Sequence, residues 1–122
     1  MKTATKGLYS EAIPNYQPTP LNKLLSCHWA KRGRLKRSDY QIIGHYLGHI
    51  PKATGKRRVT VTITLAPRQR AGDPDSYLKV LGDALVNAEI LLDDNRQWVE
   101  WAPVEFVRGP GSQTRITLED IA

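Results

Sequence analysis

Three kinds of residue in the second half of the chain could do chemistry together. Gly72 is followed by Asp73, Pro74 and Asp75, a D-x-D pair, and Lys79 comes four residues after the second aspartate. Asp93 and Asp94 form a further acidic pair. Mg²⁺ takes oxygen ligands, usually one or two carboxylates, and keeps other positions for water and phosphate. A lysine beside such an ion could stabilise charge that develops on a scissile phosphate.

The same residues have a purely structural interpretation. Asp73 is a good helix N-cap, Pro74 suits the first helical position, and Asp75 lies at the positive end of the helix dipole. Asp75 and Lys79 have the spacing of an ordinary ion pair along a helix, and the Asp93–Asp94 pair could be a turn before a strand. The local pattern alone leaves both interpretations open, and either Asp93 or Asp94 could complete a metal site.

Charge is divided unevenly along the 122 residues. Residues 1–72 contain 14 Lys and Arg against 2 Asp and Glu, a net charge of +12, whereas residues 73–122 contain 4 against 10, a net charge of −6. This asymmetry favours a polyanionic partner for the first half, and it indicates a different role for the acidic second half.

The basic residues fall into two groups. We expect phosphate contacts along DNA from both groups, and Arg68 and Arg70, which precede the D-x-D, are expected to contact phosphates beside the metal. A solvated helix face is the alternative for any run of charge. The first group is Lys31, Arg32, Arg34, Lys36 and Arg37, and the second, which flanks a predicted strand, is Lys56, Arg57, Arg58, Arg68 and Arg70.

The sequence pattern predicts the elements that position these side chains. Together they form an α+β domain spanning 1–122, with a small mixed β-sheet and helices packed on it. Strands are expected at Lys6–Ile13, Arg58–Ala66, Trp98–Val107 and Thr114–Leu118. Helices are expected at Leu24–Trp29, from Lys36 to Leu47 after a basic turn, and at Asp73–Ala88. Ser38 or Asp39 should cap the second helix, and Leu78, Leu81, Leu85 and Ala88 should form the core stripe of the third.

The stretch Arg68–Asp94 resembles the RusA family of Holliday-junction resolvases. The likeness lies in basic residues, the D-x-D, a lysine four residues later, "DAL" at Asp83–Leu85 and a closing "DD". The strand Val59–Ala66 and a "PxxxN"-like segment at Pro18–Asn22 are also similar. The detailed match covers about a quarter of the chain. The family commonly has Asn where this chain has Ser76.

The resemblance implies a small homodimeric endonuclease, bacterial or phage-related, that resolves four-way DNA junctions by paired nicks in recombination and repair. It implies Asp73, Asp75 and Asp94 as ligands of Mg²⁺, with Mn²⁺ as an alternative ion, and Lys79 as the catalytic lysine. No small-molecule cofactor and no membrane partner is expected, and the cytoplasm is the expected location. The alternative is a non-catalytic basic nucleic-acid-binding protein with a degenerate site.

Two aromatic residues stand close to the basic groups. Trp29 precedes the first basic group and Tyr40 follows it. Packing in the core or at a dimer interface is the expected role of each, and stacking on unpaired bases at a junction is the alternative.

Overall fold

The structure, a computed structural model, describes residues 7–121. Along the chain it contains five strands and three helices within these residues. They are β1 (Leu8–Pro14), α1 (Leu21–Ser26), α2 (Trp29–Leu47), β2 (Arg57–Leu65), α3 (Pro74–Asn87), β3 (Val99–Trp101), β4 (Glu105–Arg108) and β5 (Gln113–Asp120). The expected α+β class with a small mixed sheet is confirmed.

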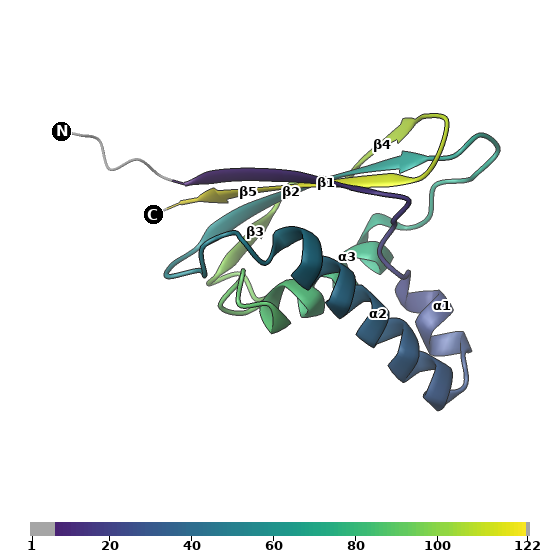
Figure 1. Ribbon diagram of the computed structural model, residues 1–122, viewed down its shortest axis with the longest axis horizontal. Helices are drawn as coiled ribbons and strands as arrows, with labels where there is room; N and C mark the ends of the chain where they lie inside the picture. The colour runs from purple at the N-terminus through teal and green to yellow at the C-terminus, as the bar shows by residue number, and fades with distance from the viewer. Residues whose placement is uncertain (1–6, 122) are drawn as a thin grey trace.

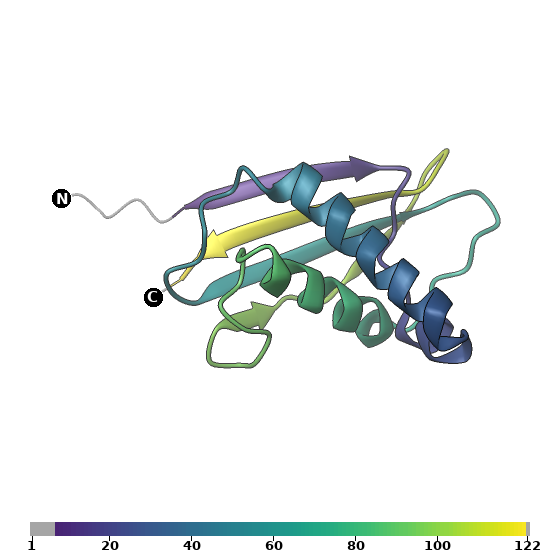
Figure 2. The same ribbon diagram turned by 60° about the horizontal axis from the view of Figure 1, so that its bottom comes forward.

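The sheet is built around β2 and β5. β5 pairs antiparallel with both β1 and β2, and the other edge of β2 pairs in parallel first with β3 and then with β4. The connection from β2 to β3 passes through α3, as a parallel pairing requires a long crossover. Both long helices lie on the same face of the sheet (Figures 1 and 2).

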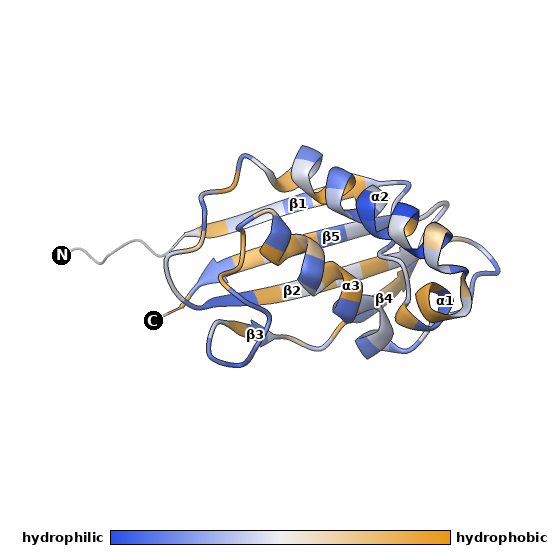
Figure 3. Cartoon of the chain, turned by 90° about the horizontal axis from the view of Figure 1, so that it is seen from below, coloured by the Kyte–Doolittle hydropathy of each residue, from blue (hydrophilic) through white to orange (hydrophobic). Residues whose placement is uncertain are grey.

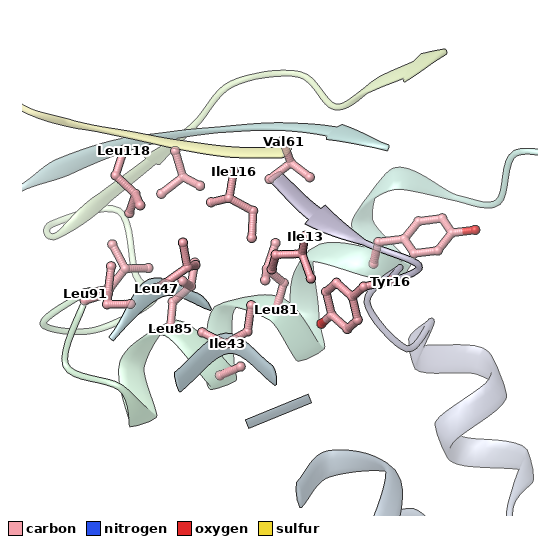
Figure 4. Packing of buried hydrophobic residues seen from close by; sticks show 14 of the residues in the cluster. Ile13, Tyr16, Ile43, Leu47, Val61, Leu81, Leu85, Leu91, Ile116 and Leu118 are labelled. Carbon is pink, nitrogen blue, oxygen red and sulfur yellow. The ribbon is translucent and has the colours of Figure 1, made fainter. Parts of the chain in front are cut away.

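The core fills the space between that face and the two helices. Ile43 and Leu47 of α2 and Leu81 and Leu85 of α3 are fully buried against Val61, Ile116 and Leu118 of the sheet (Figure 4). Strand β2 alternates buried and half-buried residues, so its valine, isoleucine and leucine side chains point to the helices and its threonines to the open face. Figure 3 shows hydrophobic segments along α3 and along the strands that lie behind it in this view.

The predicted strand over 58–66 and the helix from Asp73 are confirmed to within a residue. The α3 core stripe is wider than predicted: Tyr77, Val80 and Ala84 are buried, whereas Leu78 and Ala88 are only partly buried. The predicted strand Trp98–Val107 is wrong as a single element, because it divides into β3 and β4 around Pro103, which has no N–H for the ladder. Of the first predicted strand, Lys6 lies outside the described residues.

The basic turn predicted before Lys36 is wrong, because residues 29–47 form one continuous helix. A single Gly33 costs only about 1 kcal/mol in a helix, and the surrounding Lys, Arg and Leu are good helix formers. The cap is His28, whose Nδ1 accepts from the amide of Ala30. Asp39 is 2% exposed and accepts hydrogen bonds from Tyr16 and Thr19, at 2.6 Å each, so it anchors the middle of α2 instead of capping it.

Candidate active site

The D-x-D pair occupies the first turn of α3. Asp73 is the N-cap, and its Oδ1 accepts from the amide of Asp75 at 3.2 Å, while Pro74 takes the first helical position. Both aspartates are exposed. The structural interpretation of these residues is therefore correct, yet it leaves the Asp75 carboxylate and the second oxygen of Asp73 available for other contacts.

The chain turns sharply after α3 and brings the second acidic pair back along the helix. Glu89 adopts φ 64°, and the amides of Ile90 and Leu91 donate to the carbonyl of Leu85, so these two buried residues anchor the turn. The following loop passes close to Gly82: a Cβ on Gly82 would lie 3.5 Å from the Cβ of Asp94 and 3.3 Å from the Cζ2 of Trp101. A Cβ at position 82 would therefore make an ordinary contact with Asp94 and a slightly tight one with Trp101, so both residues lie close against the helix here.

Asp93 and Asp94 have different roles in that loop. The two oxygens of Asp93 accept from the Asp94 amide at 2.7 Å and from the Asn95 amide group at 3.2 Å, so Asp93 stabilises the turn. Asp94 points to α3, where its Oδ2 lies 3.8 Å from the Nζ of Lys79. The choice between the two acids that local pattern left open is decided in favour of Asp94 as the residue facing Lys79.

Asp75, Lys79 and Asp94 line one hollow, together with Leu78 and Trp101. The Nζ of Lys79 also lies 3.9 Å from the Oδ1 of Asp83, so the ammonium stands between two carboxylates. All three charged groups are at least 30% exposed, which keeps these ion pairs weak. The lysine can therefore move to another anion at little cost.

A second hollow adjoins the first on the far side of Asp94, lined by Tyr40, Asp83, Val86, Asn87, Asp93 and Asp94. Tyr40 of α2 is partly buried against the core, as the sequence predicted, and it also forms a wall of this hollow. Desolvation, followed by the nearby Asp83 and Asp39 carboxylates, raises the pKa of the Tyr40 phenol, so it remains a neutral hydrogen-bond donor. The sequence signal for this position was the helical spacing of Tyr40 to Ile43 and Leu47, which places all three on the face of α2 that turns toward α3.

The three expected metal ligands are brought together in part. Asp75 and Asp94 share a hollow, but Asp73 is not in its lining. Among residues 7–121, no three His, Cys, Asp or Glu side chains are grouped so as to hold a metal ion. Two carboxylates at one exposed hollow still suit Mg²⁺, which keeps several waters and is often bound by one or two protein carboxylates. Asp75 and Asp94 are therefore donors of the kind that this ion takes.

Ser76, at the position where the RusA family commonly has Asn, faces α1. Its Oγ donates to the Oδ1 of Asn22 and accepts from the Asn22 amide, both at 3.4 Å. These long hydrogen bonds connect the start of α1 to the D-x-D end of α3. The two separate segments that carried the resemblance, around Asn22 and around Asp75, are therefore neighbours in space.

The predicted DNA-contacting residues are distributed over α2 and the loop before α3. Lys31, Arg34 and Arg37 are exposed and Lys36 is half-buried. Arg32 turns back instead: its Nη2 donates to the carbonyls of Cys27 at 3.2 Å and Leu25 at 3.4 Å, closing the α1–α2 turn. Its main role is structural.

Arg68 and Arg70 are exposed on the loop between β2 and α3, and Arg68 adopts φ 75°. Two other members of the second basic group, Arg57 and Arg58, are engaged in ion pairs. Arg57 is 2% exposed, donates to Asp120 at 2.6 Å and to the carbonyl of Ile90 at 2.9 Å, and holds the C-terminal strand. It is a core residue, so its assignment to a phosphate-binding group was wrong.

Arg58 lies on the open face of the sheet, where it pairs with Glu100 and Glu119.

Across residues 7–121, no helix has the length and apolar character needed to cross a membrane.

Comparison with known proteins adds little to this geometry. No family model and no curated protein matches the chain. Among solved structures, a thiamine-monophosphate kinase from Stenotrophomonas maltophilia is similar over 99% of this chain, with 10% sequence identity and a TM-score of 0.38. The chain spans 33% of that kinase. A likeness this slight shows neither a shared fold nor a shared activity.

Proposed function

We propose that this chain is a Mg²⁺-dependent endonuclease that hydrolyses phosphodiester bonds in branched DNA, with four-way junctions as the first substrate to test. One observation carries the proposal. Asp75, Lys79 and Asp94 are separated by up to 19 residues in sequence, yet they line one exposed hollow. Their spacing is also what resembles the RusA resolvases, and the basic first half of the chain suits a polyanionic substrate.

Each residue of the hollow has a role in such a reaction. Asp75 and Asp94, with Asp73 at the helix start, would hold Mg²⁺, which when bound lowers the pKa of water and neutralises phosphate charge. Lys79 would leave Asp83 and Asp94 for a phosphate oxygen and stabilise the negative charge that grows as water attacks phosphorus. Tyr40, neutral and at the edge of the second hollow, can donate a hydrogen bond to a neighbouring phosphate.

The assembly is part of the proposal. Resolution of a four-way junction needs two cuts on strands related by symmetry, and a homodimer with one hollow in each copy would supply them. Forks and flaps offer the same exposed backbone and need only one cut. Cleavage rates on junctions, forks and flaps of equal arm length separate these substrates.

The test is cleavage of a labelled synthetic junction with Mg²⁺, with Mn²⁺ and with a chelator. Wild type should nick in either ion, and Asp75→Asn, which preserves size and removes the charge, should abolish cleavage while still binding the junction. Glu105→Gln is the matched control, because Glu105 is exposed on β4 and is absent from both hollows. Robust cutting by Asp75→Asn, or no cutting by wild type in either ion, would refute the assignment.

A second candidate is a nucleic-acid-binding protein without catalysis. It is favoured by the position of Lys79, whose ammonium lies between Asp83 and Asp94 and so partly neutralises Asp94, one of the acids that a metal would need. This candidate predicts salt-sensitive junction binding with no cleavage in Mg²⁺ or Mn²⁺. Calorimetric titration of the protein with Mn²⁺ distinguishes the two candidates. Only the nuclease requires the wild-type protein to bind the ion and Asp75→Asn to weaken that binding.

A further inference from the structure

The first residue of α2, Trp29, is 75% exposed, so of its two expected packing roles the core is excluded, whereas the dimer interface is not tested by a single chain. Its ring centroid lies 5.5 Å from that of His28, at a 37° tilt, and this pair stands at the tip of the α1–α2 turn. An indole this exposed contributes little to folding of the single chain. It is free to contact another molecule.

Trp29 begins a stripe of side chains that runs down one side of α2. Positions i, i+7 and i+11 of a helix differ by about 20° around its axis, so Trp29, Lys36 and Tyr40 lie in line over roughly 16 Å. Gly33 stands between them and has no side chain to block the path. The guanidinium of Arg37 leans over it, with Nη1 3.3 Å from where a Cβ would be.

This α2 stripe, comprising Trp29, Gly33, Lys36, Arg37 and Tyr40, ends at the acidic hollows. Tyr40 lines the hollow that contains Asp83 and Asp93 and shares Asp94 with the hollow of Asp75 and Lys79. The order along the helix is therefore an exposed aromatic ring, two cations and a neutral phenol beside the carboxylates. An exposed aromatic next to cations fits a strand of nucleic acid whose bases are unpaired, because bases stack on the ring and phosphates pair with the cations.

We infer that the α2 stripe binds an unpaired stretch of a DNA strand, with a base stacked on Trp29 and backbone phosphates on Lys36 and Arg37, and directs that strand to the acidic hollows. The inference rests on the proposed function for its choice of DNA. Two exposed cations of the same helix, Lys31 and Arg34, lie on its other side, about 160° and 140° from Trp29 around the axis.

The test measures binding of a fluorescent single-stranded oligonucleotide, a junction and a linear duplex in a chelator, so that cleavage plays no part. Trp29→Ala should weaken single-strand binding about tenfold, the effect expected for one lost base stack, and leave duplex binding unchanged. Trp29→Phe should restore most of it. Leu25→Ala, which removes a 58% exposed side chain at the same turn, is the control and should bind as wild type.

The arginines provide a second, matched pair. Arg37→Gln should weaken single-strand binding and reduce the slope of log affinity against log salt by about 0.7 for one lost phosphate contact, whereas Arg34→Gln should do neither. Equal effects of the two arginine variants, or wild-type binding by Trp29→Ala, would overturn the inference.

A change of oligomeric state of Trp29→Ala in sedimentation would also overturn it, because Trp29 would then belong to an interface between copies. None of these binding measurements requires cleavage, so the proposed role of the α2 stripe can be refuted while the nuclease assignment stands. The reverse result, single-strand binding without cleavage by wild type, would remove the nuclease alone.

Discussion

Arg68 has a backbone conformation that suits glycine. Replacing it with glycine should therefore raise the stability of the fold while weakening DNA binding. The amide of Gln69 donates to the carbonyl of Ala66 at 3.0 Å, Pro67 follows Ala66, and Arg68 has φ 75°. This is a type II turn, whose third position favours Gly. In such a turn an arginine raises the free energy of the folded state.

The surrounding contacts explain why the turn nevertheless forms. The side-chain amides of Gln69 and Gln17 donate to each other at 2.6 and 2.9 Å, and the Gln69 Oε1 accepts from the amide of Ala66. Arg108 donates to the carbonyls of Ala66 and Gln69. A strained residue persists where its neighbours over-determine the backbone, and such residues cluster at functional positions.

The size of the effect follows from two opposing terms. A left-handed conformation costs a residue with a Cβ about 1–2 kcal/mol, and glycine loses about 0.5–1 kcal/mol through the freedom of its unfolded chain. Arg68→Gly should therefore stabilise the fold by about 0.5–1 kcal/mol, or about 2–4 °C in Tm for a chain of this length. If Arg68 contacts a phosphate, the same variant should bind duplex DNA more weakly, with a salt slope lower by about 0.9.

The assays are thermal unfolding and duplex binding at several salt concentrations. Arg68→Asn is the control for the backbone, because Asn tolerates this conformation, and it should lose binding with a smaller gain in stability. Arg70→Gln should lose binding without any gain. A lower Tm for Arg68→Gly would refute the argument from backbone conformation, and unchanged salt dependence would remove Arg68 from the DNA-binding residues.

Three further changes test other parts of the structure. Gly82→Ala should gain helix propensity, but its methyl group would meet the Trp101 ring at 3.3 Å beside Asp94, so junction cleavage should slow while the Tm changes little; an unchanged rate would contradict a coupling of Trp101 to the hollow. Gly44→Ala meets no atom within 4 Å and should raise the free energy of unfolding in urea by about 0.5–1 kcal/mol, which a decrease would contradict. Asp39→Ala leaves the buried Tyr16 hydroxyl without its acceptor and should cost about 1–3 kcal/mol; part should return with Tyr16→Phe in the same chain, and strictly additive effects in a double-mutant cycle would argue against their coupling.

Local pattern was enough to predict the elements that carry the acids. Strand β2 alternates β-branched residues with period two, and Asp73, Pro74 and Asp75 together specify a helix start, so both elements follow from preferences within a few residues. The candidate acids could be named for the same reason, but local pattern left Asp93 and Asp94 as alternatives, and the set of Asp73, Asp75 and Asp94 came from the resemblance to the RusA family. The division of charge between the two halves needed composition only.

Tertiary structure decided what those residues face. Asp39 and Asp93 each looked like a cap or a ligand, yet one is buried under Tyr16 and Thr19 and the other stabilises its own turn. Arg57 resembled its basic neighbours until its contact with Asp120, 63 residues away, showed it to be a core residue. Local sequence preferences do not show which of several basic residues makes such a long-range contact.

The acidic hollow shows the same division. Sequence determined that Asp75, Lys79 and Asp94 were available at the ends of two predicted elements. Only packing brought Asp94 back along α3 to Lys79, because the approach depends on the buried anchors Ile90 and Leu91. These contacts join residues that are far apart in sequence and close in space, which no local preference encodes.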